Sequence, residues 1–209
     1  MPTTIPVAAI RHGPTDWNEQ RRIQGRADRP LSRAGRETVS GWALPAELAA
    51  FDWYVSPLSR ARETASLLGL DPVVEPALIE MDWGEWDGAK GPDLRARYGD
   101  AFDRELARGL DMRPHGGETP RDLRARVAGW LDRVRLDRRP AGAVCHQGVI
   151  RALLSLATGW DMVAKPPVEL EWSAVQVFAL ADDGSVVLDR ANVMLDSGQP
   201  GPRPHASRR

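Results

Sequence analysis

The feature that most constrains the fold is a short apolar run, residues 5–10, which ends abruptly at Arg11, His12 and Gly13. A run of this length, flanked by Pro and Gly, is typical of a buried parallel strand. In open α/β sheets, ligands bind just beyond the carboxyl ends of the strands. The sequence therefore places a guanidinium and an imidazole where a ligand is expected, and Gly13 permits a sharp turn beside it.

The pattern of a short strand followed by a helix returns along the chain. Further strands are predicted at residues 52–55, 72–75 and 141–145, and helices at 32–50, 56–69, 119–137 and 149–159. Strands that alternate with helices indicate a mostly parallel sheet covered by helices on both faces. The predicted fold class is therefore α/β, a three-layer sandwich with a mostly parallel central sheet.

Two β-rich runs, residues 173–181 and 185–193, flank Asp182-Asp183-Gly184 and predict an antiparallel edge hairpin. A chain of 209 residues can bury a core as one domain, which we predict over residues 1–195. Residues 89–114 predict a small helical insertion within it. From residue 196 the chain is rich in Gly, Pro, Arg and Ser, which predicts a disordered tail at 196–209.

The charge balance narrows the classes of partner. The chain has 28 Lys and Arg against 29 Asp and Glu, so its formal net charge is −1. This balance gives no general electrostatic basis for a nucleic-acid or membrane partner, and any anion site must be local. Only Lys90 and Lys165 are lysines, so the positive charge is almost entirely arginine, which binds phosphate bidentately.

Cysteine content and hydropathy bear on location and cofactors. The single cysteine, Cys145, excludes an intramolecular disulfide framework. We see no signal-peptide pattern and no segment approaching the roughly 20 apolar residues of a membrane helix, so we expect a cytoplasmic protein. Four histidines and one cysteine show no metal-ligand spacing such as His-x-x-x-His, so no metal or other cofactor is expected.

Polar groups follow three predicted strands at the point where each strand ends. Arg11 and His12 follow the first, Ser56 and Arg60 follow the second, and His146 follows the run that ends at residue 145. Because parallel strands end at one edge of a sheet, these side chains are expected to form a compact cationic pocket. Such a pocket suits a phosphoryl group, whose transition state spreads negative charge over its oxygens. An imidazole can attack phosphorus and form a covalent intermediate.

Five motifs occur in order along the chain and together resemble the histidine phosphatase superfamily, the phosphoglycerate-mutase-like fold. The resemblance covers about residues 5–159 and also fits the terminal hairpin. The motifs are Arg11-His12-Gly13, Ser56-Pro-Leu-Ser-Arg60-Ala61, Glu80-Met-Asp-Trp-Gly84-Glu-Trp-Asp-Gly88, Gly116-Gly-Glu-Thr-Pro120 and Cys145-His146-Gln-Gly148.

The resemblance implies a role for each matching residue. His12 would be the nucleophile that becomes a phosphohistidine. Glu80 would protonate the leaving oxygen and later activate water, with Asp82 and Glu85 as competing candidates for this acid. Polar side chains, together with backbone amides near Gln147, would hold the phosphoryl group. The side chains are Arg11, Arg60 and His146, with further hydrogen bonds from Asn18 and Gln24.

Two positions depart from the pattern of many relatives. Pro14 stands where Glu commonly follows Arg-His-Gly, and proline fixes φ and removes a backbone donor. Gln147 follows the second histidine, where Gly or Asn is common. Neither difference removes a catalytic group, and both bear on the contacts to substrate.

The resemblance implies a metal-independent phosphomonoesterase, a hydrolase of the histidine acid phosphatase type, that acts on a small phosphorylated metabolite. The first alternative is a cofactor-dependent phosphoglycerate mutase, which must exclude water and hold a substrate carboxylate, usually with adjacent arginines in an insert. The insert at residues 89–114 is short and its arginines are never adjacent, which favours hydrolysis. The second alternative is a non-catalytic module that binds phosphorylated ligands, and the presence of all the chemical groups argues against it.

Substrate specificity is expected to reside in residues 11–30 and 89–114. The arginines of the insert indicate either an anionic or polar substrate or a solvated helix face; they are Arg95, Arg97, Arg104 and Arg108. We expect His115 in a loop near the pocket mouth. Neither the physiological substrate nor the oligomeric state follows from these patterns.

Overall fold

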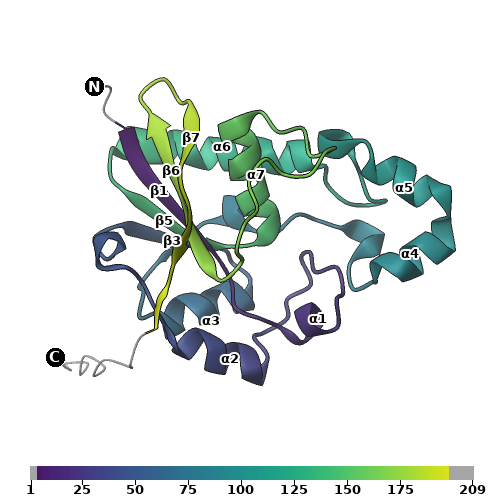
Figure 1. The fold of residues 1–209 in the computed structure, drawn as a ribbon, viewed down its shortest axis with the longest axis horizontal. Helices are drawn as coiled ribbons and strands as arrows, with labels where there is room; N and C mark the ends of the chain where they lie inside the picture. The colour runs from purple at the N-terminus through teal and green to yellow at the C-terminus, as the bar shows by residue number, and fades with distance from the viewer. Residues whose placement is uncertain (1–3, 198–209) are drawn as a thin grey trace.

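The computed structural model describes residues 4–197 and contains a six-stranded sheet between two layers of helices (Figure 1). The strand order is β4-β3-β5-β1-β6-β7. The first four strands pair in parallel, and the β1–β6 and β6–β7 pairs are antiparallel. The strands are β1 (Thr4–Arg11), β3 (Asp52–Val55), β4 (Val73–Val74), β5 (Ala141–Cys145), β6 (Ala174–Ala181) and β7 (Val186–Met194). The predicted α/β fold class with an antiparallel edge hairpin is confirmed.

Side chains of β1 alternate between two cores, because successive residues of a strand point to opposite faces of the sheet. Val7 and Ala9 belong to the core under α6 (Pro120–Asp137) and α7 (Gln147–Thr158). Ala8 and Ile10 belong to the core under α3 (Ser59–Leu67), which α2 (Arg33–Ser40) contacts. Figure 1 shows these two helix pairs on opposite sides of the sheet.

The helix predicted at residues 32–50 is wrong in its second half. α2 ends at Ser40, and the chain continues as β2 (Trp42–Ala43) and the 3₁₀ helix η1 (Ala46–Leu48). Gly41 caps the helix, and Pro45 disfavours helical backbone in the residue before it. The apolar spacing of Leu44 and Leu48 suggested one helix, but glycine and proline divide the segment.

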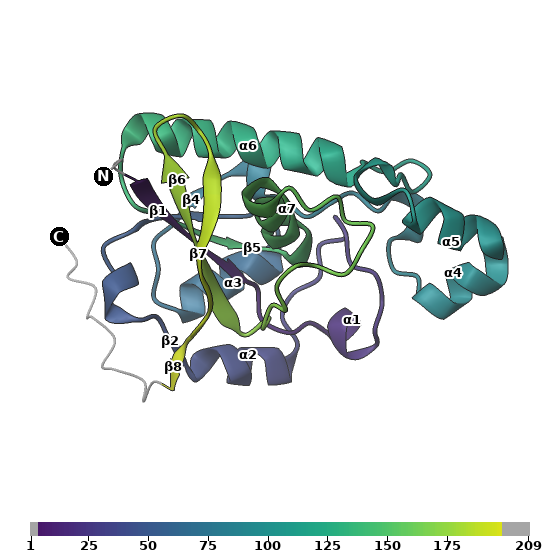
Figure 2. The same ribbon diagram turned by 45° about the horizontal axis from the view of Figure 1, so that its top comes forward.

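The chain between β4 and α6 carries short helices that extend to one end of the molecule (Figure 2). Two 3₁₀ helices, η2 (Pro76–Leu78) and η3 (Gly84–Trp86), precede the predicted insert. The insert contains α4 (Gly91–Tyr98), α5 (Asp100–Leu106) and the 3₁₀ helix η4 (Gly109–Asp111). Phe102 is buried against Trp86, with ring centroids 4.9 Å apart, and this contact attaches the insert to the rest of the protein.

The predicted start of the disordered tail, residue 196, lies two residues too early for the described part of the chain. Asp196 and Ser197 form β8 (Asp196–Ser197), which pairs antiparallel with β2. Backbone pairing of this kind needs no apolar pattern, so composition did not reveal it. The remaining residues of the predicted tail, 198–209, lie outside the described part of the chain.

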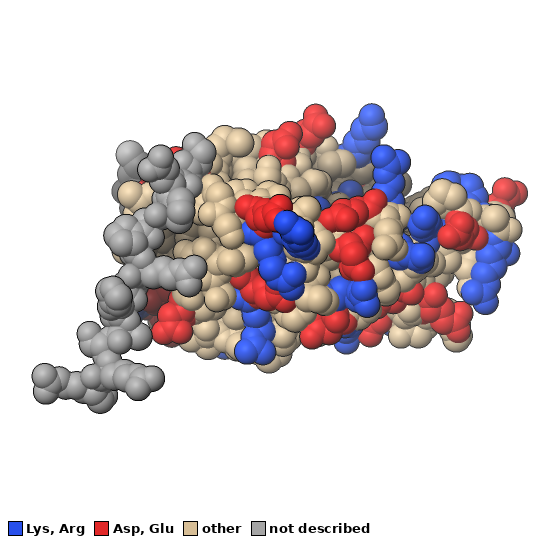
Figure 3. Space-filling model, turned by 90° about the horizontal axis from the view of Figure 1, so that it is seen from below, with Lys and Arg blue, Asp and Glu red and all other residues tan. Residues whose placement is uncertain are grey.

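The surface carries charges of both signs. Ion pairs in the described part of the chain include Arg36–Glu63 and Arg33–Glu37. Acidic and basic side chains are interspersed on the face shown in Figure 3. This face therefore presents no extended field of one sign, as the near-zero net charge suggests. Within residues 4–197, no helix combines the length and the apolar character that a membrane crossing needs.

Candidate active site

The carboxyl ends of β1, β3 and β5 lie side by side, because β5 pairs in parallel with both of its neighbours. In this register Arg11 lies opposite Cys145, and Val55 lies opposite Val144. The residues that follow the three strands therefore meet at one edge of the sheet. They are His12, Ser56 and His146.

The hydrogen bonds of His12 define its tautomer. Nδ1 lies 2.7 Å from the carbonyl oxygen of Gly13, which can only accept, so Nδ1 carries the proton. Nε2 is then unprotonated and accepts a hydrogen bond from Nε of Arg60 at 3.2 Å. Burial holds the pKa of His12 well below its ordinary value, and the charges of Arg11 and Arg60 lower it further. His12 is thus a neutral imidazole with its lone pair directed at a guanidinium.

His146 is fully buried beside His12, with ring centroids 5.1 Å apart and planes inclined by 58°. Its Nε2 lies 2.6 Å from Oγ of Ser56, and that oxygen also accepts from the N–H of Leu58 at 3.3 Å. The Ser56 hydroxyl can donate to Nε2 or accept from it, so this contact fits either tautomer of His146. Nδ1 is buried and has no partner within the described residues, and in the tautomer that protonates it this nitrogen can donate to a bound oxyanion.

Arg60 connects α3 to the loop that follows β1. It is fully buried, and its Nη1 and Nη2 donate to the carbonyl oxygens of Ala27 and Gly25 at 3.0 and 2.7 Å. Burial lowers the pKa of Arg60 to about 10, so the side chain keeps its charge at neutral pH. The two carbonyls hold the guanidinium in a single orientation against His12.

Arg11 faces the same region from the end of β1. Its guanidinium lies 5.5 Å from the centre of the Trp172 ring, and its Nε is buried with no partner in residues 4–197. Burial lowers its pKa, partly opposed by the negative charge of Glu80. A second arginine with spare donors therefore lies at the candidate site.

The Glu80 carboxyl group is buried, and two backbone amides hold it. Oε1 accepts from the N–H of Met81 at 2.7 Å, and Oε2 accepts from the N–H of Gly148 at 3.2 Å. A Cβ at position 148 would lie 2.2 Å from Oε1, so glycine is required for this approach. Burial raises the pKa of Glu80, although the two hydrogen bonds and the nearby arginines partly oppose it.

Asn18 and Gln24 lie on the cavity wall and are held by Thr15. The side-chain oxygen of Asn18 accepts from the N–H of Thr15 at 3.0 Å, in a capping box that begins α1 (Asp16–Glu19). Oε1 of Gln24 lies 2.9 Å from the Thr15 hydroxyl, which donates to it, and Nε2 of Gln24 is buried without a partner in the described chain. Gln147, the first residue of α7, also lines the cavity.

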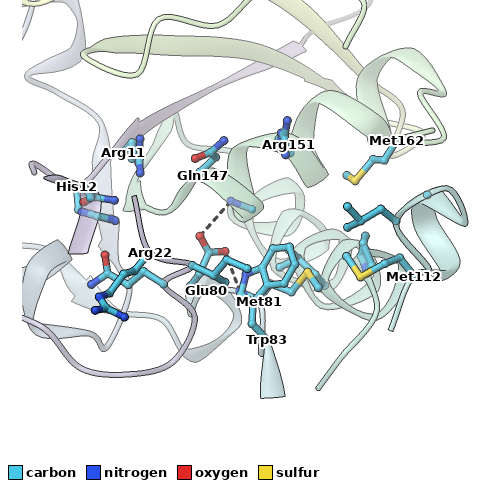
Figure 4. Close-up of a pocket in the computed structure, with 18 of the residues that line it drawn as sticks. Arg11, His12, Arg22, Glu80, Met81, Trp83, Met112, Gln147, Arg151 and Met162 are labelled. Carbon is cyan, nitrogen blue, oxygen red and sulfur yellow. Dashed lines mark hydrogen bonds between the residues drawn. The ribbon is translucent and has the colours of Figure 1, made fainter. Parts of the chain in front are cut away.

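A cavity of about 460 Å³ opens beside His12 (Figure 4). Its polar end, as we define it, consists of Arg11, His12, Asn18, Arg22 and Gln24. Its apolar end consists of Leu106, Met112, Met162 and Val163. Glu80, Gln147 and Arg151 lie between the two ends. Arg60 and His146 do not line the cavity; both are fully buried behind it and contact or adjoin His12.

Sequence reasoning missed several residues that line this cavity. Arg151 lies four residues after Gln147 on α7, and this helical spacing could have shown that the two share a face. Arg22 lies in the loop after α1 and offered no comparable signal. Met162 and Val163 also gave none, because they belong to an irregular segment that reaches the cavity by contacting η4.

The arginines of the insert do not line the cavity. Arg95 pairs with Asp103 at 2.7 Å, Arg108 pairs with Glu105 at 3.0 Å, and Arg97 lies over the ring of Tyr98. The insert contributes Leu106, Gly109 and Met112 instead. The alternative of a solvated, ion-paired helix face therefore describes these arginines.

The two competing carboxylates lie outside the cavity. Asp82 pairs with Arg26 at 3.3 Å, and Glu85 lies 2.9 Å from Nδ1 of His115. His115 is exposed, and it also lies outside this cavity. Of the three carboxylates considered from the sequence, the structure brings Glu80 to the site.

Comparisons with known proteins show which family this chain resembles. The family model of the histidine phosphatase superfamily (branch 1) matches residues 7–193. A 2,3-bisphosphoglycerate-dependent phosphoglycerate mutase of Methylobacterium radiotolerans is 32% identical over 191 residues, which cover 85% of this chain and 90% of that protein. A mycobacterial glucosyl-3-phosphoglycerate phosphatase superposes with a TM-score of 0.77 at 25% identity, over 91% of this chain and 100% of that chain.

The matched segment contains every strand of the central sheet except the first residues of β1 and the last residue of β7. It also contains all five motifs recognised in the sequence. The chain therefore belongs to the histidine phosphatase superfamily.

Proposed function

We propose that this protein is a metal-independent phosphomonoesterase that acts through a phosphohistidine at His12. The observation that carries the proposal is the unprotonated Nε2 of His12, which is buried and held among cationic side chains at the polar end of the cavity. Members of this superfamily act on small phosphorylated substrates, and a structural relative named as a phosphatase supports hydrolysis.

In the first step, Nε2 of His12 attacks phosphorus and the bond between phosphorus and the alcohol oxygen breaks. The phosphoryl oxygens are stabilised by Nε of Arg11, Nε2 of Gln24 and Nδ1 of His146 in its protonated form, because each of these nitrogens is buried without another partner in the described chain. The Nε–H of Arg60, which donates to Nε2 of His12 in the free protein, then donates to a phosphoryl oxygen instead. These groups supply the charge that phosphoryl transfer requires.

The Glu80 carboxyl group donates its proton to the departing alcohol oxygen. In the second step the resulting carboxylate takes a proton from water, the water oxygen attacks phosphorus, and the bond to Nε2 breaks to release inorganic phosphate. The raised pKa of Glu80 suits a carboxyl group that must begin the cycle protonated. The lowered pKa of His12 suits a nitrogen that must begin it neutral.

The second candidate is a phosphoglycerate mutase, and the observation that favours it is the 32% identity to the Methylobacterium protein of that name. A mutase needs cations for a substrate carboxylate. Arg151 is a cavity residue that forms no salt bridge within residues 4–197 and could serve. The insert, however, contributes only Leu106, Gly109 and Met112 to the cavity wall, and its arginines contact other residues. This composition favours hydrolysis.

The test measures phosphate release from p-nitrophenyl phosphate in EDTA, from acidic to neutral pH. We expect turnover by the wild-type protein and a loss of at least about 10⁴-fold in His12→Ala, because the nucleophile is removed. The matched control is His115→Ala, which removes an exposed imidazole outside the cavity and should keep full activity.

A parallel assay supplies phosphoglycerate and 2,3-bisphosphoglycerate. Isomerisation that exceeds phosphate release would replace the phosphatase by the mutase. Phosphate binding without turnover in either assay would favour the non-catalytic module.

A further inference from the structure

We propose that the substrate is the phosphate monoester of an apolar alcohol, alkyl or aryl, rather than of a sugar or a sugar acid. This inference rests on the proposed function, because it assumes that the phosphoryl group occupies the polar end of the cavity beside His12. The alcohol must then extend past Glu80 towards the apolar end.

The apolar end is formed by side chains without strong hydrogen-bonding groups. Figure 4 shows Met112 and Met162 at the end of the cavity opposite His12, and Leu106 and Val163 also line it. Methionine side chains are flexible and polarisable, so they adapt to apolar groups of different shape. An alkyl or aryl group therefore finds contacts here that do not depend on one exact outline.

Part of the cavity wall between the two ends is also apolar, beside the polar side chains of Glu80, Gln147 and Arg151. Met81 and Trp83 lie next to Glu80, and Leu123 of α6 is a further buried neighbour. Hydroxyl groups of a sugar would lose hydrogen bonds to water against such a wall and find few replacements. Methylene groups, by contrast, gain from leaving water.

Two segments that are distant in sequence create the apolar end. The N–H of Leu110 donates to the carbonyl oxygen of Asp161 at 2.9 Å, which joins η4 to the segment that follows α7. Gly109 permits this approach, because a Cβ there would lie 2.6 Å from Cγ2 of Val163. Val163 remains 56% exposed, so it lies at the opening where a longer alcohol would emerge.

Arg151 borders the apolar end. Figure 4 shows it between Gln147 and Met162, and its guanidinium is 5.7 Å from the centre of the Trp160 ring. Burial lowers its pKa, and the negative charge of Glu80 opposes this effect. The cation thus lies over an aromatic ring at the border of the apolar end, whose own four side chains carry no charge.

The first experiment compares ethyl, butyl and hexyl phosphate, which share one leaving-group chemistry and differ only in apolar length. We expect kcat/KM to rise about two- to fourfold for each added methylene, as far as the chain contacts the apolar end. Glycerol phosphate, which is short and polar, should be no better than ethyl phosphate. A flat series, or a preference for glycerol phosphate, would overturn the inference.

The second experiment uses Val163→Asp, which places a charge at the apolar end on an exposed loop. We expect kcat/KM for hexyl phosphate to fall about tenfold and that for ethyl phosphate to change less than about twofold. Val187→Asp is the matched control, because Val187 is 53% exposed on edge strand β7 and does not line the cavity. Equal losses for both esters, or the same effect in the control, would contradict the assignment.

A binding measurement separates this inference from the proposed function. Ethylphosphonate and hexylphosphonate carry no cleavable ester, so calorimetry with them reports the cavity alone. Tighter binding of hexylphosphonate without hydrolysis of any ester would support the apolar end and refute the phosphatase. Hydrolysis of all three esters with equal phosphonate affinities would keep the phosphatase and refute the apolar substrate.

Discussion

The polar and apolar ends of the cavity are built in different ways. At the polar end, His12 follows a strand of the central sheet, and it is 6% exposed with the fully buried Arg60 and His146 behind it. At the apolar end, Leu106 and Val163 come from the insert and from a loop, and they are 37% and 56% exposed. The groups proposed to react are thus held by the sheet, whereas the groups proposed to contact the alcohol lie on peripheral segments. Such segments can vary without disturbing the core.

The largest effect on the chemistry, as opposed to the binding of the alcohol, should come from Glu80→Gln. This change removes the proposed proton donor and preserves the shape of the side chain. We expect the rate of alcohol release from ethyl phosphate in the first turnover to fall about 10²- to 10⁴-fold. Release of p-nitrophenol should fall much less, because that leaving group needs no proton. Glu85→Gln, at a surface carboxylate outside the cavity, is the control. Equal losses for the two substrates would remove Glu80 from the acid role.

Gly148→Ala tests how precisely the Glu80 carboxyl group must be positioned. The added Cβ would meet Oε1 of Glu80 at 2.2 Å and displace the carboxyl group. We expect kcat to fall by up to about 10²-fold, measured with ethyl phosphate, while the protein stays folded. Gly129→Ala is the matched control in α6, where a Cβ meets nothing within 4 Å, and it should raise stability by up to about 1 kcal/mol. Unchanged kcat in Gly148→Ala would show that this contact is unimportant.

The pH profile of kcat/KM should be bell-shaped, because His12 must be neutral and Glu80 protonated. With ordinary pKa values of about 6.5 and 4.3 the two required forms would hardly coexist. Burial lowers the pKa of His12, which moves the acid limb to lower pH, and raises the pKa of Glu80, which moves the alkaline limb to higher pH. Each limb should fall about tenfold per pH unit. If Glu80→Gln retains the alkaline limb, that limb belongs to another group.

The smallest effect is expected from Arg95→Ala and Arg108→Ala. These side chains are ion-paired on the surface of the insert and do not line the cavity. We expect kcat/KM for every ester of the alkyl series to stay within about twofold of the wild type. A loss confined to one of these substrates would show that the insert reaches the substrate in a way that its position at the apolar end does not explain.

Local signals in the sequence were sufficient to predict the chemistry-bearing edge of the fold. The short apolar runs before Arg11 and His146 are strands, and parallel pairing with β5 brings these residues together. The hairpin around Gly184 also follows from local turn chemistry, since this glycine has a φ of +85°. Local signals gave a wrong prediction where two of them disagreed. At residues 32–50 the apolar spacing suggested one helix, but Gly41 and Pro45 interrupt it.

The sequence by itself determined which residue types stand at the strand ends, because strand length and the change from apolar to polar residues are local properties. Only the tertiary structure decided the tautomer of His12, the anchoring of Arg60 by Gly25 and Ala27, and the burial of Glu80 against Gly148. It likewise decided that the insert and the loop after α7 form an apolar wall. These features depend on contacts between segments far apart in the chain, and no periodicity within either segment records the partner that it will meet.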